Sequence, residues 1–118
     1  MTPEVFEARC LGLPAATLVI QWGGTSVFKV GGKIFALANG LVDRRASGYM
    51  FKVSDMAYEL LIEQGLARPA PYLARAKWVQ LVDNDILPDN ELAAYLGQAH
   101  ALVAARLTRA ARRELGLA

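Results

Sequence analysis

Few side chains in this sequence are suited to acid–base or metal chemistry. The chain has one histidine, His100, and one cysteine, Cys10, which are too few soft ligands for a zinc site or a disulfide framework. Asp83, Asp85 and Asp89 form a short acidic cluster, but its spacing lacks the glycine and the final glutamate of a calcium loop. A solvated turn followed by a helix cap explains the cluster better. We therefore expect no metal and no cofactor.

Signatures of catalysis are also missing. The sequence has no P-loop, dinucleotide fingerprint, nucleophile elbow or His-Glu zinc motif. The pairs Gly23-Gly24 and Gly31-Gly32 do not open a helix, so they indicate turns rather than phosphate-binding loops. His100 is expected mid-helix beside an apolar stripe, where an imidazole is more often structural, and Cys10 is expected to fill the core. The sequence favours a protein that is not an enzyme.

Basic residues offer the remaining binding chemistry. They repeat at helical spacing near the carboxyl end of the chain with Arg112 beside them, flank a predicted hairpin, and surround a predicted strand that carries a tryptophan. Cations neutralise phosphates, and an aromatic ring among them can stack on a base. The candidate nucleic-acid contacts are Lys29, Lys33, Arg75, Lys77, Trp78, Arg106, Arg109 and Arg113. The alternative is a core tryptophan, solvated lysines and arginines that favour the negative end of a helix dipole.

Length and composition point to one domain over residues 1–118. Hydrophobic residues make up 54% of the chain and charged residues 20%, enough to build a single core. The formal net charge of +2 permits contact with nucleic acid without requiring it. No stretch reaches the roughly 20 apolar residues of a membrane span, and the first ten residues lack the basic region of a signal peptide. We expect a cytoplasmic protein with no membrane contact.

Helix signals surround a run of strand signals. Thr2-Pro3-Glu4, Ser54-Asp55 and Pro88 are typical helix starts. The predicted helices cover residues 2–11, 56–64 and 88–113, and the predicted strands cover residues 18–22, 26–30, 33–38, 48–53 and 77–82. The order α-β-β-β-β-α-β-α favours an α+β fold, with an antiparallel sheet of about five strands and helices packed on one face. The other face is left free.

Gly31-Gly32 indicates a two-residue hairpin, because both central positions of a type I′ turn need positive φ. This turn pairs Val30 with Lys33 and predicts that Phe28 lies opposite Phe35, with both rings pointing into the core.

Five segments together resemble the MmcQ/YjbR family of small bacterial proteins. They are CLGLP at 10–14, WG at 22–23, VFKVGGKIFA at 27–36, FKVS at 51–54 and PAPYLARAKWV at 69–79. The resemblance implies a frataxin-like (CyaY-like) fold, which agrees with the element order, and a DNA-binding function with a double-wing mode of contact. The family offers no catalytic motif to carry over. The contacts that the resemblance implies are Lys29 and Lys33 at the hairpin, and Arg75, Lys77 and Trp78.

A frataxin-like fold also suggests a second hypothesis, which is iron binding through an acidic first helix. That helix carries only Glu4 and Glu7, countered by Arg9, so iron delivery is disfavoured. The leading hypothesis is a non-enzymatic protein that binds DNA weakly and without sequence preference. The alternative is a protein-interaction or small-ligand module that uses the helix-free sheet face, one version of which is a homodimer.

Overall fold

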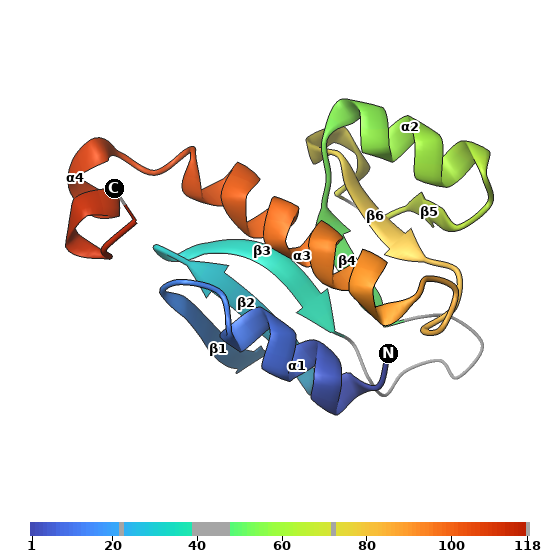
Figure 1. Cartoon of the computed structure of the whole chain (residues 1–118), viewed down its shortest axis with the longest axis horizontal. Coiled ribbons are helices and arrows are strands. Elements are labelled where there is room, and N and C mark those ends of the chain that lie inside the picture. Colours follow the sequence, from blue (N-terminus) through green and yellow to red (C-terminus); the bar gives the residue numbers. More distant parts are fainter. Residues whose placement is uncertain (22, 39–47, 72, 118) are drawn as a thin grey trace.

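The computed structural model describes residues 1–21, 23–38, 48–71 and 73–117, and within them it forms a six-stranded antiparallel sheet covered by helices (Figure 1). The elements are α1 (Pro3–Leu11), β1 (Ala16–Gln21), β2 (Thr25–Val30), β3 (Lys33–Ala38), β4 (Tyr49–Lys52), α2 (Asp55–Glu63), β5 (Ala67–Pro69), the 3₁₀ turn η1 (Ala74–Ala76), β6 (Trp78–Leu81), α3 (Asp89–Ala104) and α4 (Arg109–Glu114). The spatial strand order is β1-β2-β3-β4-β6-β5. The predicted α+β class is confirmed.

One main core joins the sheet to its helices. The buried apolar side chains of α1, α2 and α3 all belong to it, including Phe6, Leu61 and Leu96, together with Phe28 and Phe51 from the strands. Because these helices share one core with the same sheet face, they pack on one side, as predicted. Thr2 and Ser54 cap α1 and α2 through their side chains, which explains why these two helix starts were readable from the sequence.

Strand β5 was not predicted. It has three residues, ends in Pro69 and pairs with β6 at the outer edge of the sheet. An edge strand can hold a proline because no neighbour needs its missing N–H donor. So short a strand with a proline leaves no periodic pattern in the sequence.

The prediction of one helix over residues 88–113 is wrong. Helix α3 ends at Ala104, and α4 begins at Arg109 after a separate cap, where the Thr108 hydroxyl accepts a hydrogen bond from the Ala111 amide at 3.0 Å. Leu107 remains 7% exposed and packs into the main core. The i, i+4 spacing of Val103 and Leu107 therefore continues across the break, so the apolar periodicity gave no sign of it.

The hairpin register follows the prediction only as far as its second pair. Val30 lies opposite Lys33 and Lys29 opposite Ile34, after which the register shifts and Phe28 lies opposite Ala36, not Phe35. Such a shift is the effect of a bulge, in which one strand contributes an extra residue. Phe28 and Phe35 are both fully buried in the main core, as predicted.

The helix-free face is not simply left open. Val27, Leu37, Ala70 and Trp78 form a second buried cluster there, with Leu73 packed against it. The segment that leads into η1 therefore covers part of this face. Val27 is 0% exposed, so the apolar patch expected around it is filled from within the chain.

Candidate nucleic-acid interface

The antiparallel register brings several basic segments to one end of the sheet, here called the hairpin end. Ala36 lies opposite Phe51 and Lys52 opposite Trp78, so the Gly31-Gly32 turn, the end of β4 and the start of β6 share this end. Figure 1 shows the hairpin tip pointing toward α4, while η1 lies apart from it beside α2. The hairpin end therefore carries two separate basic groups.

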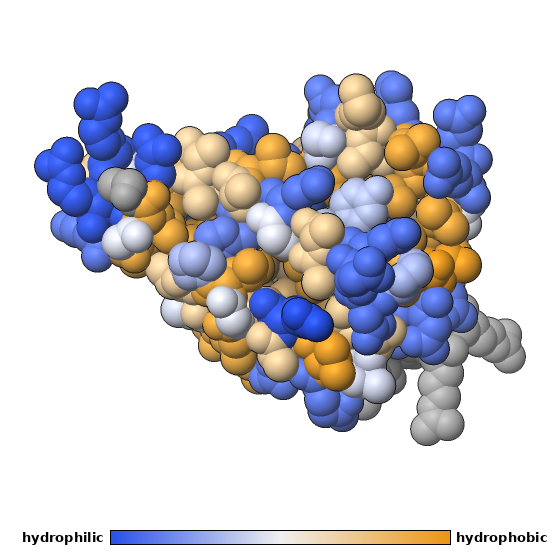
Figure 2. All heavy atoms as spheres, in the orientation of Figure 1, coloured by the Kyte–Doolittle hydropathy of each residue, from blue (hydrophilic) through white to orange (hydrophobic). Residues whose placement is uncertain are grey.

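The first group, the hairpin–α4 surface, consists of Lys33, Arg109, Arg112 and Arg113, whereas Lys29 lies opposite Ile34 on the helix-free face of the hairpin. Gly31 packs so closely on Leu107 that an added Cβ would lie 2.6 Å from Leu107 Cδ1. This contact places the segment just before α4 against the hairpin turn, although the two are far apart in sequence. Lys33, Arg109 and Arg113 are exposed, and Lys29 and Arg112 are half-buried. Figure 2 shows strongly hydrophilic residues gathered over α4.

The second group surrounds η1. Arg75 is exposed, whereas Lys77 is half-buried with its Nζ 4.7 Å from the centre of the Tyr58 ring, a cation–π distance. Lys52 Nζ donates a hydrogen bond to the Ala76 carbonyl. Burial, and then the charge of Arg106, lower the pKa of Lys52. The structure thus adds Lys52, which sequence reasoning missed although it lies in the FKVS segment, and it separates Lys77 from the hairpin lysines.

Trp78 and Arg106 differ from the rest of the predicted set. Trp78 is 6% exposed and packs in the second cluster, so its ring offers no free face for a base. Arg106 is exposed, and its charge acts on the Lys52 ammonium of the second group. Arg44 and Arg45, which lie in the predicted loop before β4, fall outside the described residues.

Acidic residues gather at the opposite end of β6. The Met1 ammonium lies 2.8 Å from Asp85 and 3.3 Å from Asp89, and it donates a hydrogen bond to the Asn84 carbonyl at 3.1 Å. The bond to Asp85 raises the pKa of the ammonium, and burial opposes this rise. Asp83 accepts a hydrogen bond from the Asp85 amide at 2.7 Å, as in an Asx turn. This acidic cluster is a structural turn that holds the start of α1.

His100 has a structural contact. Its Nε2 lies 2.7 Å from the Pro14 carbonyl oxygen, and its ring meets Phe35 edge-on at 5.4 Å. A carbonyl only accepts hydrogen bonds, so Nε2 must carry the proton. We expect His100→Phe to destabilise the fold by about 1–3 kcal/mol, because it leaves the Pro14 oxygen unpaired. His100→Gln keeps a donor and should cost less in urea denaturation; equal losses would contradict the role of this bond.

No group of three or more His, Cys, Asp or Glu side chains is placed to hold a metal ion among the residues that the structure describes. Cys10 is fully buried, and burial raises the pKa of its thiol to about 12. A thiol with so high a pKa is a poor nucleophile. None of the described helices is long and apolar enough to cross a membrane.

Comparisons with known proteins agree with the fold. The YjbR family model matches residues 11–102. Among solved structures, the crystal structure of Deinococcus radiodurans protein DR2400, with domain DUF419, has a TM-score of 0.84 and 26% sequence identity, and the match covers 99% of this chain and 89% of that chain. A search of curated proteins gives no match. The family model spans well over half of the sequence, and the chain belongs to the YjbR family.

Proposed function

We propose that this protein is a non-enzymatic DNA-binding protein of the cytoplasm whose hairpin–α4 surface holds phosphates. The observation that carries the proposal is the contact between Gly31 and Leu107, which brings the hairpin turn, with Lys33, close to the segment that leads into α4 and its arginines. Cations from two distant parts of the chain then face solvent together, while the acidic turn lies at the other end of the sheet. Such a concentration of one charge attracts a polyanion although the net charge is only +2.

The chemistry of this surface predicts the kind of binding. Lysine and arginine side chains neutralise phosphates whatever the DNA sequence. The described residues of this surface include no exposed aromatic ring that could stack on a base. We therefore expect non-specific affinity, with a dissociation constant of about 10⁻⁴ to 10⁻⁶ M and a strong salt dependence. Arg75 forms a second, weaker contact point near η1.

Fluorescence anisotropy with duplex and single-stranded DNA at low salt tests the proposal. The double variant Lys33→Glu/Arg109→Glu is expected to weaken duplex binding about tenfold or more. It should also reduce the slope of log K against log salt by about 0.9 for each phosphate that the variant no longer neutralises. If the unmodified protein showed no saturable binding with a dissociation constant below about 100 µM, DNA would not be its ligand.

Arg68→Glu is the matched control. Arg68 is also exposed, but it lies on β5 at the outer edge of the sheet, four strands away from the hairpin strand β2 in the sheet order. Its reversal changes the net charge as Lys33→Glu alone does, without touching the proposed surface. If Arg68→Glu and Lys33→Glu weakened binding equally, the effect would be one of net charge and the hairpin–α4 surface would not be the site.

A further inference from the structure

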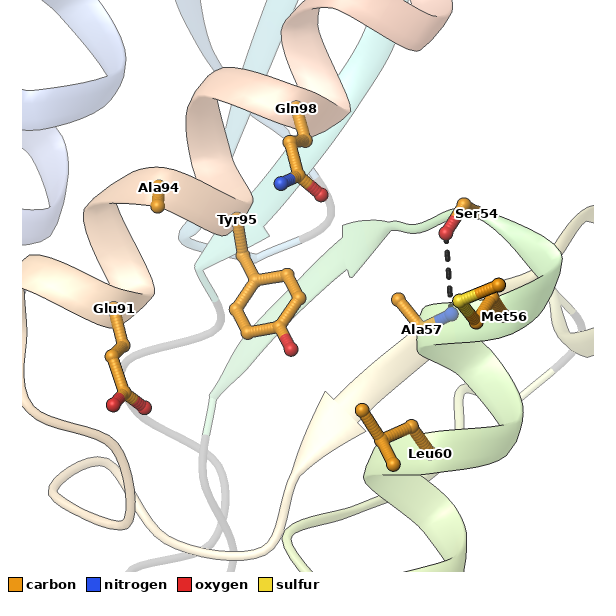
Figure 3. A pocket seen from close by; sticks show the side chains of 8 residues that line it. All are labelled: Ser54, Met56, Ala57, Leu60, Glu91, Ala94, Tyr95 and Gln98. Carbon is orange, nitrogen blue, oxygen red and sulfur yellow. Dashed lines mark hydrogen bonds between the residues drawn. The ribbon is translucent and has the colours of Figure 1, made fainter.

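A groove runs between α2 and α3 on the helical side of the molecule (Figure 3). Its volume is about 410 Å³, and an adjoining hollow of about 270 Å³ extends it along α3. Ser54 and Gln98 line both spaces, and the Ser54 hydroxyl is occupied as the helix cap of α2. The groove therefore follows α3 from its first turn, at Glu91, to Ala105, the residue after its end.

The α2 wall of the groove exposes large apolar side chains. Met56 is 80% exposed and Leu60 is 45% exposed, and Figure 3 shows both on α2, across the groove from Tyr95 of α3. Neither side chain belongs to either buried cluster. Adjacent exposed apolar residues beside a groove are the usual mark of a surface that another protein covers.

The α3 wall has the pattern of a helix that packs closely against another helix. Glu91, Ala94, Gln98, Ala101 and Ala105 line the groove at successive spacings of three, four, three and four residues. A 3-4 repeat keeps these positions on one seam, and alanines at the seam allow a close approach of two backbones. The two ends of the seam lie at equal distances from Gln98, with Glu91 seven residues before it and Ala105 seven residues after it.

The charges at the two ends of the seam favour a second copy of this chain as the occupant. When two copies of α3 pack antiparallel and cross at Gln98, Glu91 of one copy lies opposite Ala105 of the other, beside Arg106. Glu91 and Arg106 are exposed, and neither forms an ion pair with another described residue. A parallel pair would instead place Glu91 opposite Glu91, which is repulsive. The charges of the seam are thus complementary to those of a second copy that runs in the opposite direction.

We propose that the α2–α3 groove is an isologous dimer interface occupied by a second copy of this chain. The two α3 helices pack antiparallel, Glu91 of each copy pairs with Arg106 of the other, and Met56 and Leu60 of both copies fill the space between the grooves. A two-fold interface of this kind uses one self-complementary surface on each subunit. It is distinct from the hairpin–α4 surface and from the helix-free sheet face.

Sedimentation velocity across a concentration series tests the proposal on the full chain. We expect dimers at about 100 µM and a monomeric Ala101→Arg variant, since a long charged side chain at the seam keeps the helices apart. Glu91→Arg and Arg106→Glu are each expected to weaken dimerisation about tenfold, because each puts like charges together at both ends of the seam. The double variant Glu91→Arg/Arg106→Glu should restore it.

The rescue separates loss of the interface from loss of folding, and Arg68→Glu on β5 is the control, with no expected effect on the dimer. A protein that stays monomeric at about 100 µM overturns the proposal. So does a dimer that Ala101→Arg leaves intact, because its interface would lie on another face. A double variant that fails to recover would exclude the antiparallel pairing of Glu91 with Arg106.

Discussion

Phe6→Ala is expected to lower the free energy of unfolding by about 3–5 kcal/mol. Phe6 is fully buried, stacks on the Tyr49 ring at 4.2 Å and meets Phe28 edge-on at 5.8 Å. Alanine would remove both aromatic contacts and leave a cavity between α1 and the sheet. Tyr49 would lose its stacking partner while its hydroxyl still donates to the Met1 carbonyl at 2.8 Å, so the pocket has little freedom to collapse.

Urea denaturation followed by circular dichroism measures this loss. The neighbouring variant Val5→Ala is the control, because Val5 is 37% exposed on the same helix and its truncation should cost only about 0.5 kcal/mol. Phe6→Leu should fall between the two, since it keeps most of the buried volume. If Phe6→Ala were no worse than Val5→Ala, α1 would not be part of the cooperative core.

Local signals in the sequence were sufficient for most of the fold. The Gly31-Gly32 turn predicted its hairpin because both glycines adopt positive φ, of 58° and 78°. The caps at Thr2 and Ser54 predicted two helix starts for an equally local reason. The register beyond Lys29 was missed because the turn residues fix only the pairs next to the turn, and the register shifts between Phe28 and Lys29.

Contacts between distant segments account for the other differences. Val27 is buried by Ala70 and Trp78, which lie more than forty residues away, so no local pattern indicated that the helix-free face would be partly covered. The same cluster explains why Trp78 is buried, although Arg75 and Lys77 precede it in the sequence. Burial of this kind depends on topology and not on composition.

The sequence predicted which residues form the candidate site, but it did not predict how they are arranged in space. Lys33 and Arg109 were recognisable as exposed cations from their types and spacing. Their association requires α3 to stop at Ala104, so that Leu107 meets the hairpin turn. The only local sign of that break was Thr108, a residue type that often caps the start of a helix. The regular apolar spacing around it predicted an unbroken helix instead.

Gly31→Ala tests this arrangement and is expected to destabilise the protein by about 2–4 kcal/mol. Two effects contribute. Alanine at a φ of 58° is strained, and its Cβ would lie 2.6 and 2.7 Å from the two methyl carbons of Leu107, which is itself nearly buried. The side chain of Leu107 must move, which disturbs its packing on the turn just before α4.

Gly32→Ala is the matched comparison, because Gly32 also has positive φ, of 78°, but a Cβ there would meet nothing within 4 Å. It should show the strain alone, about 1–2 kcal/mol. The difference between the two variants in urea denaturation therefore measures the contact with Leu107, and Leu107→Ala should abolish that difference in a double-mutant cycle.

DNA affinity should fall further in Gly31→Ala than in Gly32→Ala. Equal losses of stability would mean that Leu107 does not pack on the turn in solution, and the hairpin and α4 would then not form one surface.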